Sequence, residues 1–202
     1  LLPESQRNLM HAVLDTGKPV IVCLMAGSAI DLSEAEEKAA AVVQAWYPGA
    51  RGGKAVADIL FGDCSPSGKL PVTFYRTIEE LPDFEDYSME GRTYRYMKGE
   101  ALYPFGYGLT YGKVEVQEAA VTAKDDTTRE VKLCIKAANH GKYGTDEVLQ
   151  VYCKDRESAY AVPNHSLCAF TRIHLEAGET KQVEITIPGS AFYAVNEEGE
   201  FI

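Results

Sequence analysis

The sequence lacks long hydrophobic runs and has little positive charge. No stretch of about 18 apolar residues occurs, so no membrane-spanning helix is predicted. The 20 Lys and Arg residues stand against 30 Asp and Glu, which gives a net charge of −10. Such an acidic chain is not expected to bind nucleic acid or an anionic membrane surface. Residues 1–10 also lack a basic segment followed by an apolar core, so no signal peptide is expected.

Paired cysteines and spaced metal ligands are missing as well. The five cysteines are odd in number and form no C-x-x-C pair: Cys23, Cys64, Cys134, Cys153 and Cys168. Most lie in apolar runs, so we expect reduced core residues and a reducing compartment, which favours the cytoplasm. The four histidines show no repeated ligand spacing. We therefore predict neither a metal site nor a cofactor.

Residues 1–75 alternate helix and strand patterns. The runs PESQRNLMHAVLDTG, DLSEAEEKA and GGKAVADILFG predict helices, the second with Ser33 as N-cap and Glu36 completing a capping box. Between and after them, KPVIVCLMAG, AAVVQAWYPG and GKLPVTF are short apolar runs typical of buried strands. This alternation predicts a mostly parallel sheet with helices on its faces.

Residues 113–202 have a different period. Five runs alternate apolar and polar residues, and turn clusters such as KDDTT and HGKYGT separate them. Regular short strands without helical patterns predict a β-sandwich of immunoglobulin or fibronectin type III kind. Residues 76–112 would then be an interdomain linker, rich in aromatic residues and glycine.

Motifs for catalysis are weak. The Gly27-Ser28 turn lacks the second glycine of a G-x-S-x-G elbow, and GARGGKAV lacks the spacing of a phosphate-binding loop. Acidic residues gather at 31–37 and 83–86, and two of them could lie at the separation of about 5–5.5 Å that a retaining glycosidase needs. Negative charge at a helix N-terminus or a loop explains the same residues without catalysis.

The segment MEGRTYRYMKGEALYPFGYGLTYG, residues 89–112, allows two interpretations. Its tyrosines and arginines could stack on sugar rings and bind their hydroxyl groups. The same residues could instead join two domains, with Arg92 and Arg95 pairing with acids and the aromatic rings packing between the domains.

The order of the motifs resembles that of a known enzyme family. The stretch from AWYPGARGGKAVADILFGDCSPSGKLPVTF through GRTYRYMKGEALYPFGYGLTYG resembles the C-terminal half of glycoside hydrolase family 3, the β-glucosidase and β-xylosidase family. LPESQRNLMHAV and GKPVIVCLMAG extend it toward the N-terminus, and GTDEVLQVY and AFTRIHLEAGET extend it through the second half. The resemblance implies part of a three-layer α/β sandwich domain (1–75), the linker (76–112) and a fibronectin type III-like domain (113–202).

The resemblance also implies a retaining β-glycosidase. In that family an aspartate nucleophile comes from an N-terminal barrel, and a glutamate acid/base lies just upstream of the LPESQ equivalent. Neither has a counterpart here, so we predict no catalytic residue in this chain. The absent initiator Met and the end at NEEGEFI, inside an expected hairpin, also favour a fragment of a longer, bacterial enzyme.

The expected partners are the missing barrel and a β-linked oligosaccharide or glycoside. Arg92, Tyr94 and Arg95 are the candidates for contact with substrate or barrel. A stand-alone carbohydrate-binding module and a structural or interaction domain remain the alternatives.

Overall fold

The structure is a computed structural model that describes residues 1–202. The chain folds into two compact units, each of which takes residues from two stretches. The first unit comprises Leu1–Cys64 and Leu70–Tyr107, and the second comprises Ser65–Lys69 and Gly108–Ile202. No helix of the chain is both long and apolar enough to cross a membrane.

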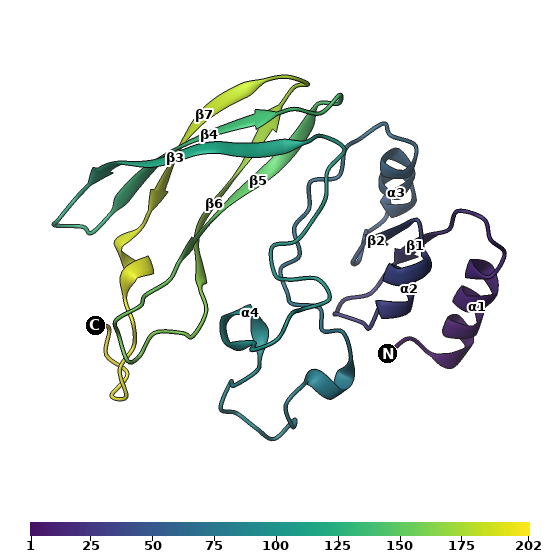
Figure 1. Ribbon diagram of the computed structural model, residues 1–202, viewed down its shortest axis with the longest axis horizontal. Coiled ribbons are helices and arrows are strands. Elements are labelled where there is room, and N and C mark those ends of the chain that lie inside the picture. The colour runs from purple at the N-terminus through teal and green to yellow at the C-terminus, as the bar shows by residue number, and fades with distance from the viewer. The chain divides into compact units, whose positions relative to one another are not determined.

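The first unit contains a two-stranded parallel sheet and its helices (Figure 1). The predicted alternation of helices and strands up to residue 60 is confirmed. Its elements, in chain order, are α1 (Glu4–Leu14), β1 (Ile21–Leu24), α2 (Ser33–Lys38), β2 (Ala41–Gln44), α3 (Gly52–Leu60), the 3-10 helix η1 (Ile78–Glu80) and the short α4 (Thr93–Tyr96). Residue pairs such as Ile21 with Ala41 set the register between β1 and β2.

The predicted strand in GKLPVTF is wrong, because this segment pairs outside the sheet. The N–H of Phe74 donates to the carbonyl of Tyr103 at 2.9 Å, and the N–H of Leu102 donates back to Phe74 at the same distance. Phe74 with Tyr103 is the one β-bridge of this segment, although Leu70 also exchanges backbone bonds with Gly106 and Tyr107. Pro71 supplies no N–H, which prevents a continuous ladder through the segment.

The core of the first unit depends on this pairing. Phe74 is 1% exposed and lies with Leu102 in the same cluster as residues of β1 and α2. The Phe74 ring meets Tyr103 edge-on, with ring centroids 6.2 Å apart. Leu102 and Tyr103 belong to the stretch that the sequence assigns to a linker, and here they fill a core.

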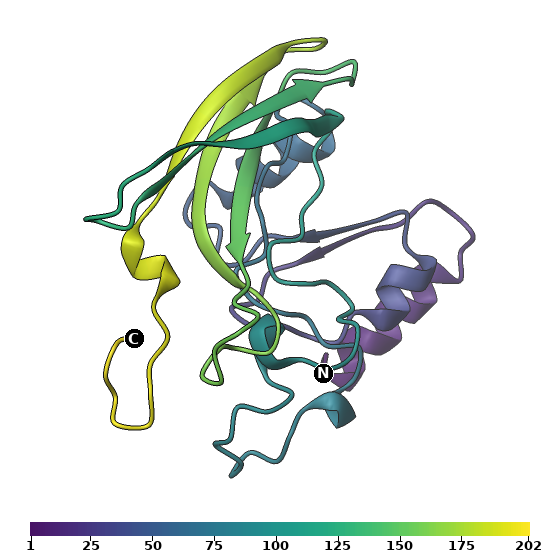
Figure 2. The same cartoon turned by 60° about the vertical axis from the view of Figure 1, so that its left-hand side comes forward.

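Helices α1 and α2 lie side by side in both ribbon views (Figures 1 and 2). The Arg7 guanidinium and the His11 ring both bind the Glu34 carboxylate, at 2.5 and 2.6 Å. These bonds lower the pKa of Glu34 to about 2, so the carboxylate stays charged. The capping box is wrong: Ser33 is the first helical residue rather than the N-cap, because Asp31 accepts its N–H at 3.0 Å.

The second unit is a β-sandwich, which confirms the predicted all-β half. Its elements are β3 (Val114–Lys124), β4 (Val131–Asn139), β5 (Thr145–Cys153), β6 (Ser166–Leu175), β7 (Thr180–Ile187) and the 3-10 helix η2 (Gly189–Phe192). One sheet has the order β3-β4-β7, and the other pairs β5 with β6; every pairing is antiparallel. Side chains of β4, β5, β6 and β7 form the buried cluster between the sheets.

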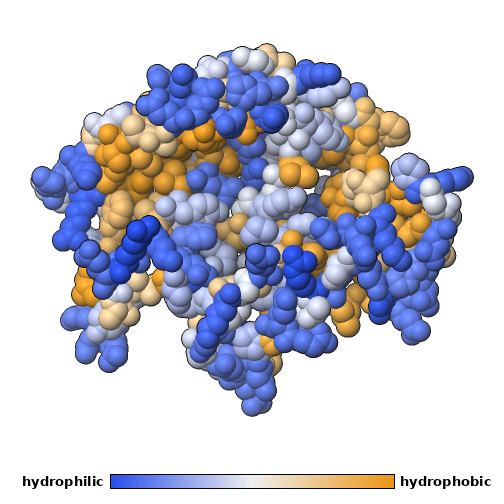
Figure 3. Space-filling model, viewed as in Figure 1, coloured by the Kyte–Doolittle hydropathy of each residue, from blue (hydrophilic) through white to orange (hydrophobic).

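The smaller sheet leaves part of β3 uncovered. Val116 and Val121 pair in register with Ala137 and Leu133 of β4, so they lie on the face of the sheet that carries the core. They are nevertheless 51% and 52% exposed. Figure 3 shows hydrophobic residues gathered on this side of the sandwich unit, below its hydrophilic rim.

The buried Asn139 side chain joins three segments of the sandwich. Its Oδ1 accepts the N–H groups of Lys113 and Gly141, at 3.0 and 2.9 Å. Its Nδ2 donates to the carbonyls of Tyr143 and Leu175, at 2.8 and 3.2 Å. All four hydrogen-bonding positions of the amide are therefore filled at a site with 0% exposure.

We expect Asn139→Ala to lower the free energy of unfolding by roughly 2–4 kcal/mol, because it leaves two donors and two acceptors buried without partners. Urea unfolding, followed by circular dichroism of the β-sandwich, measures the loss. Asn8→Ala on exposed helix α1 is the matched control and should change stability by less than about 0.5 kcal/mol. Equal losses in both variants would contradict this role of Asn139.

Candidate functional site

The three residues predicted to face substrate or barrel lie in and beside the short helix α4, at the end of a loop. We call residues 83–98 the arginine loop. Its backbone is strained: Met89 has φ 66° and Thr93 has φ 56°, and these are two of only four non-glycine residues with positive φ in the chain. Such conformations are costly for residues with a side chain and are concentrated at functional sites.

Arg92 holds the arginine loop together from within. Its Nη2 donates to the carbonyl oxygens of Asp83 and Asp86, at 2.6 and 3.0 Å. The expected pairing of Arg92 with acidic side chains is replaced by bonds to backbone oxygens. Carbonyl oxygens outside helices and sheets usually accept hydrogen bonds from water. Here one guanidinium takes the place of water for two carbonyls, and it thereby fixes the course of the loop.

Tyr94 and Arg95 form a stacked array beside Phe105. The rings of Tyr94 and Phe105 stack with centroids 4.2 Å apart and planes 12° apart. Arg95 lies over the Tyr94 ring, 5.8 Å from its centroid, and its Nε donates to the Tyr94 hydroxyl at 3.4 Å. The structure therefore brings Tyr94 and Arg95 into contact, while Arg92 points to the other end of the loop.

Tyr75 anchors the start of helix α4. Its hydroxyl accepts the N–H of Thr93 at 2.8 Å and donates to the carbonyl of Gly91 at 3.2 Å. Tyr75 precedes the arginine loop in sequence and follows the core residue Phe74 directly. Tyr75, which no sequence pattern identified, therefore connects the stacked array of Tyr94 and Arg95 to the core of the first unit.

Two exposed aromatic residues also went unrecognised in the sequence. Phe84 and Tyr87 are 88% and 85% exposed, on the acidic part of the arginine loop. Phenyl and phenol rings this exposed are available to pack against another surface or a sugar ring. Their isolation between charged residues in PDFEDYSME was the signal that could have identified them.

One acidic residue in each of the two acidic groups is held by bonds that do not suit catalysis. Asp86 accepts the N–H of Ser88 at 2.8 Å, and this bond lowers the pKa of the Asp86 carboxyl. Glu34, in the other acidic group, is held charged by Arg7 and His11. Neither can act as a general acid near neutral pH, since both are ionised there.

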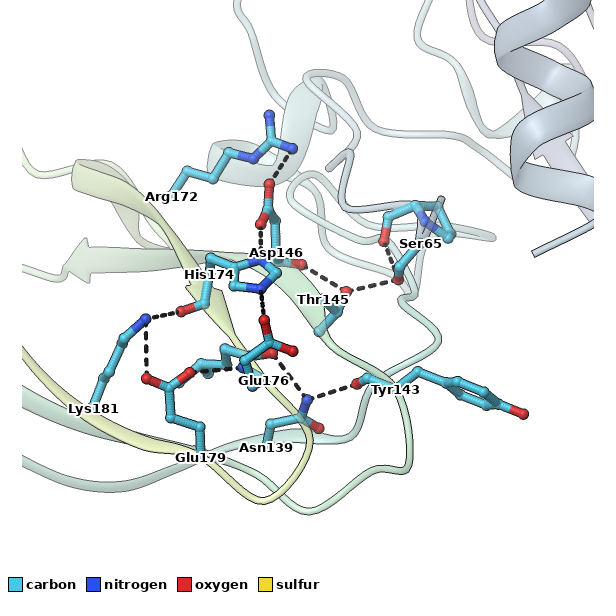
Figure 4. Close-up of polar contacts among 12 residues, drawn as sticks. Ser65, Asn139, Tyr143, Thr145, Asp146, Arg172, His174, Glu176, Glu179 and Lys181 are labelled. Atoms are coloured by element: carbon cyan, nitrogen blue, oxygen red, sulfur yellow. Dashed lines mark hydrogen bonds and ion pairs between the residues drawn. The ribbon is translucent and has the colours of Figure 1, made fainter. Parts of the chain in front are cut away.

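The second unit carries a separate polar cluster around His174, drawn in Figure 4. His174 Nδ1 lies 2.7 Å from Asp146 Oδ1, and Nε2 lies 3.2 Å from Glu176 Oε1. Arg172 binds the other oxygen of Asp146 at 2.5 Å. The carboxylates of Asp146 and Glu176 raise the pKa of His174, while His174 and then Arg172 lower the pKa of Asp146.

The His174 cluster has the form of a surface ion network. His174 and Arg172 side chains are 52% and 64% exposed, and the cluster joins neighbouring strands β5 and β6. Nowhere in residues 1–202 do three or more His, Cys, Asp or Glu side chains form a group that could hold a metal ion.

Comparison with protein families finds two matches in the chain. Residues 1–111 match the glycosyl hydrolase family 3 C-terminal domain, which covers more than half of the chain. This chain belongs to glycosyl hydrolase family 3. Residues 147–202 match a fibronectin type III-like domain, so the family 3 chain carries the β-sandwich expected after its α/β part.

Relatives of this family 3 chain are named as glycosidases. A xylan 1,4-beta-xylosidase of Xylanibacter ruminicola is 46% identical over 92% of this chain and 21% of its own length. A periplasmic beta-glucosidase of Salmonella typhimurium is 35% identical over 99% of this chain and 28% of its own length. The chain thus spans about a quarter of the length of these relatives.

Solved structures are similar to this chain as well. A beta-glucosidase from Kluyveromyces marxianus matches with a TM-score of 0.86 and 30% identity, over 99% of this chain and 25% of that chain. A beta-glucosidase from Listeria innocua, solved in complex with glucose, matches with a TM-score of 0.84 and 30% identity, over 100% of this chain and 30% of that chain. The fold described above is therefore the fold of the C-terminal part of family 3 enzymes.

We expect Arg92→Met to free the first half of the arginine loop, because the two carbonyls lose their common donor. Hydrogen exchange followed by mass spectrometry should show faster exchange at residues 84–88 with little change in β1 and β2. Arg95→Met keeps both carbonyl bonds and is the matched control. Unchanged exchange in Arg92→Met would show that the guanidinium does not fix the loop.

We expect His174 to titrate above its usual value of about 6.5. Stability contributed by the protonated ring is complete below about pH 6.5 and is lost as the pH rises through the higher folded-state pKa. NMR titration of the imidazole measures this pKa, and Asp146→Asn should move it down because it removes the largest cause of the shift. A His174 pKa at or below the usual value would contradict the network in Figure 4.

Proposed function

We propose that this chain is the non-catalytic C-terminal portion of a retaining β-glycosidase that hydrolyses terminal β-D-glycosyl residues such as glucose or xylose. Family membership and the names of the relatives support the reaction class. The proposal gives the nucleophilic aspartate to an N-terminal barrel, which is the partner of this chain. The substrate is a β-linked oligosaccharide or glycoside bound by the whole enzyme.

The use of the acidic side chains supports a non-catalytic role. A retaining glycosidase needs one carboxylic acid to protonate the leaving oxygen and one carboxylate to attack the anomeric carbon. Glu34 is bound by a cation and a histidine, and Asp86 is bound by a backbone N–H. Low pKa values at both positions are the opposite of what the general acid requires.

We further infer that the arginine loop is the part of this chain that meets substrate or barrel. Its strained backbone, the exposed rings of Phe84 and Tyr87, and the Tyr94–Arg95 array support this placement. In this proposal Arg92 positions the loop. Arg95 offers guanidinium donors and Tyr94 a hydroxyl, and both kinds of group bind sugar hydroxyls or carboxylates.

We expect the purified chain to show no hydrolysis of aryl β-glucosides or β-xylosides, even at high protein concentration. Activity should appear when this chain replaces the matching C-terminal part of the Xylanibacter ruminicola enzyme, because the barrel then supplies the nucleophile. Activity of the chain alone that persists through purification would overturn the proposal. It would direct attention back to the acids at 31–37 and 83–86.

The same hybrid enzyme tests the arginine loop. Arg95→Met should lower kcat/KM by about tenfold or more, as expected for the loss of a charged hydrogen bond. Lys98→Met, which removes a nearby exposed cation bound to Glu90, is the matched control. Calorimetry of the chain alone with cello- and xylo-oligosaccharides tests the binding-module alternative, which requires saturable heat.

A further inference from the structure

Two cysteines of the β-sandwich lie against each other on neighbouring strands. Cys153 is the last residue of β5 and Cys168 lies in β6, with their Sγ atoms 3.0 Å apart. The ladder pairs Tyr152 with Leu167 and Val151 with Ala169, so Cys168 is the extra residue of a β-bulge. The bulge directs the Cys168 side chain toward β5, where its Sγ also donates to the carbonyl of Val151 at 3.2 Å.

We propose that Cys153 and Cys168 are a redox-active dithiol that forms a reversible disulfide, with a small disulfide such as oxidised glutathione as the oxidant. A disulfide needs the sulfurs about 2.05 Å apart. The present separation therefore closes with a shift of about 1 Å. The two strands are already paired in register on both sides of the bulge, so this shift needs no rearrangement of the sheet.

A small reagent can reach this pair from the surface. Both residues are half-buried, and Cys168 lines an open cavity of about 410 Å³ between β6 and β7. The cavity walls are residues 167–171 of β6 and 184–186 of β7. Of the other three cysteines, Cys23 and Cys134 are half-buried on strands of different sheets, and Cys64 is exposed.

The exchange balances as two thiol–disulfide steps. One thiolate of the pair attacks a sulfur of oxidised glutathione, and the first glutathione leaves with the electron pair and takes up a proton. The second thiol loses its proton to water and attacks the protein sulfur of this mixed disulfide, which releases the second glutathione. The protein is oxidised by two electrons, and the glutathione disulfide is reduced to two thiols.

Oxidation should be slow at neutral pH and should stabilise the sandwich. Burial, together with the neighbouring Cys153 thiol, raises the pKa of the Cys168 thiol to about 12, so this sulfur is protonated in the resting state. The new bond closes a loop from residue 153 to residue 168, and His165 in this loop meets the ring of Tyr152, just outside it, edge-on at 4.9 Å. Cross-linking this segment restricts the unfolded chain more than the folded one.

The test is incubation of the full chain for hours with oxidised glutathione, followed by thiol counting in denaturant and peptide mapping. We expect two of the five thiols to disappear, a peptide linking residues 153 and 168, and a rise of roughly 5–10 °C in the midpoint of thermal unfolding. Dithiothreitol should reverse all three changes.

Variants separate this pair from the other thiols. Cys153→Ser and Cys168→Ser should each abolish the linked peptide and the thermal shift, whereas Cys64→Ser should leave both unchanged. Retention of all five thiols, an adduct on Cys64 alone, or a disulfide that survives in Cys153→Ser would each overturn the proposal. The result is independent of glycosidase activity, so it does not depend on the proposed function.

Discussion

The β-sandwich depends on one buried amide. Asn139 ends β4, and its side chain binds the chain just before β3, the turn after β4 and the end of β6. Each of these segments has backbone groups that a strand ladder cannot reach, because they lie where strands end. A side chain with two donors and two acceptors can satisfy all of them from one position, which an apolar residue of similar size cannot do.

The α/β unit depends in the same way on a segment from outside its sheet. Phe74, Leu102 and Tyr103 complete a core that two strands and three helices alone leave open. The next residue, Tyr75, fixes the first turn of α4, and Arg92 fixes the loop before it. A continuous series of contacts therefore runs from the buried core, through Tyr75 and helix α4, to the Tyr94–Arg95 array.

Local patterns predicted most of the fold and little of the site. The alternating runs located β3 to β7, and the apolar runs located β1 and β2, because side-chain periodicity follows from strand geometry. The strand expected in GKLPVTF failed because Pro71 has no N–H, so the segment forms a single bridge between Phe74 and Tyr103 in place of a ladder. Arg92 could be identified as a candidate, but its carbonyl partners could not, because backbone oxygens leave no signature in a sequence.

The short stretch Ser65–Lys69 has a consequence for folding during synthesis. Its Ser65 hydroxyl meets the Thr145 hydroxyl 80 residues later, at 2.7 Å, and its Lys69 ammonium meets Glu147 at 2.7 Å. At about 5–20 residues per second, the ribosome delivers those partners roughly 4–16 s afterwards. During that interval the stretch has no sandwich to join, although the flanking residues already belong to a unit whose core can form. The stretch thus joins the sandwich through contacts of long sequence separation, the kind that slows folding most.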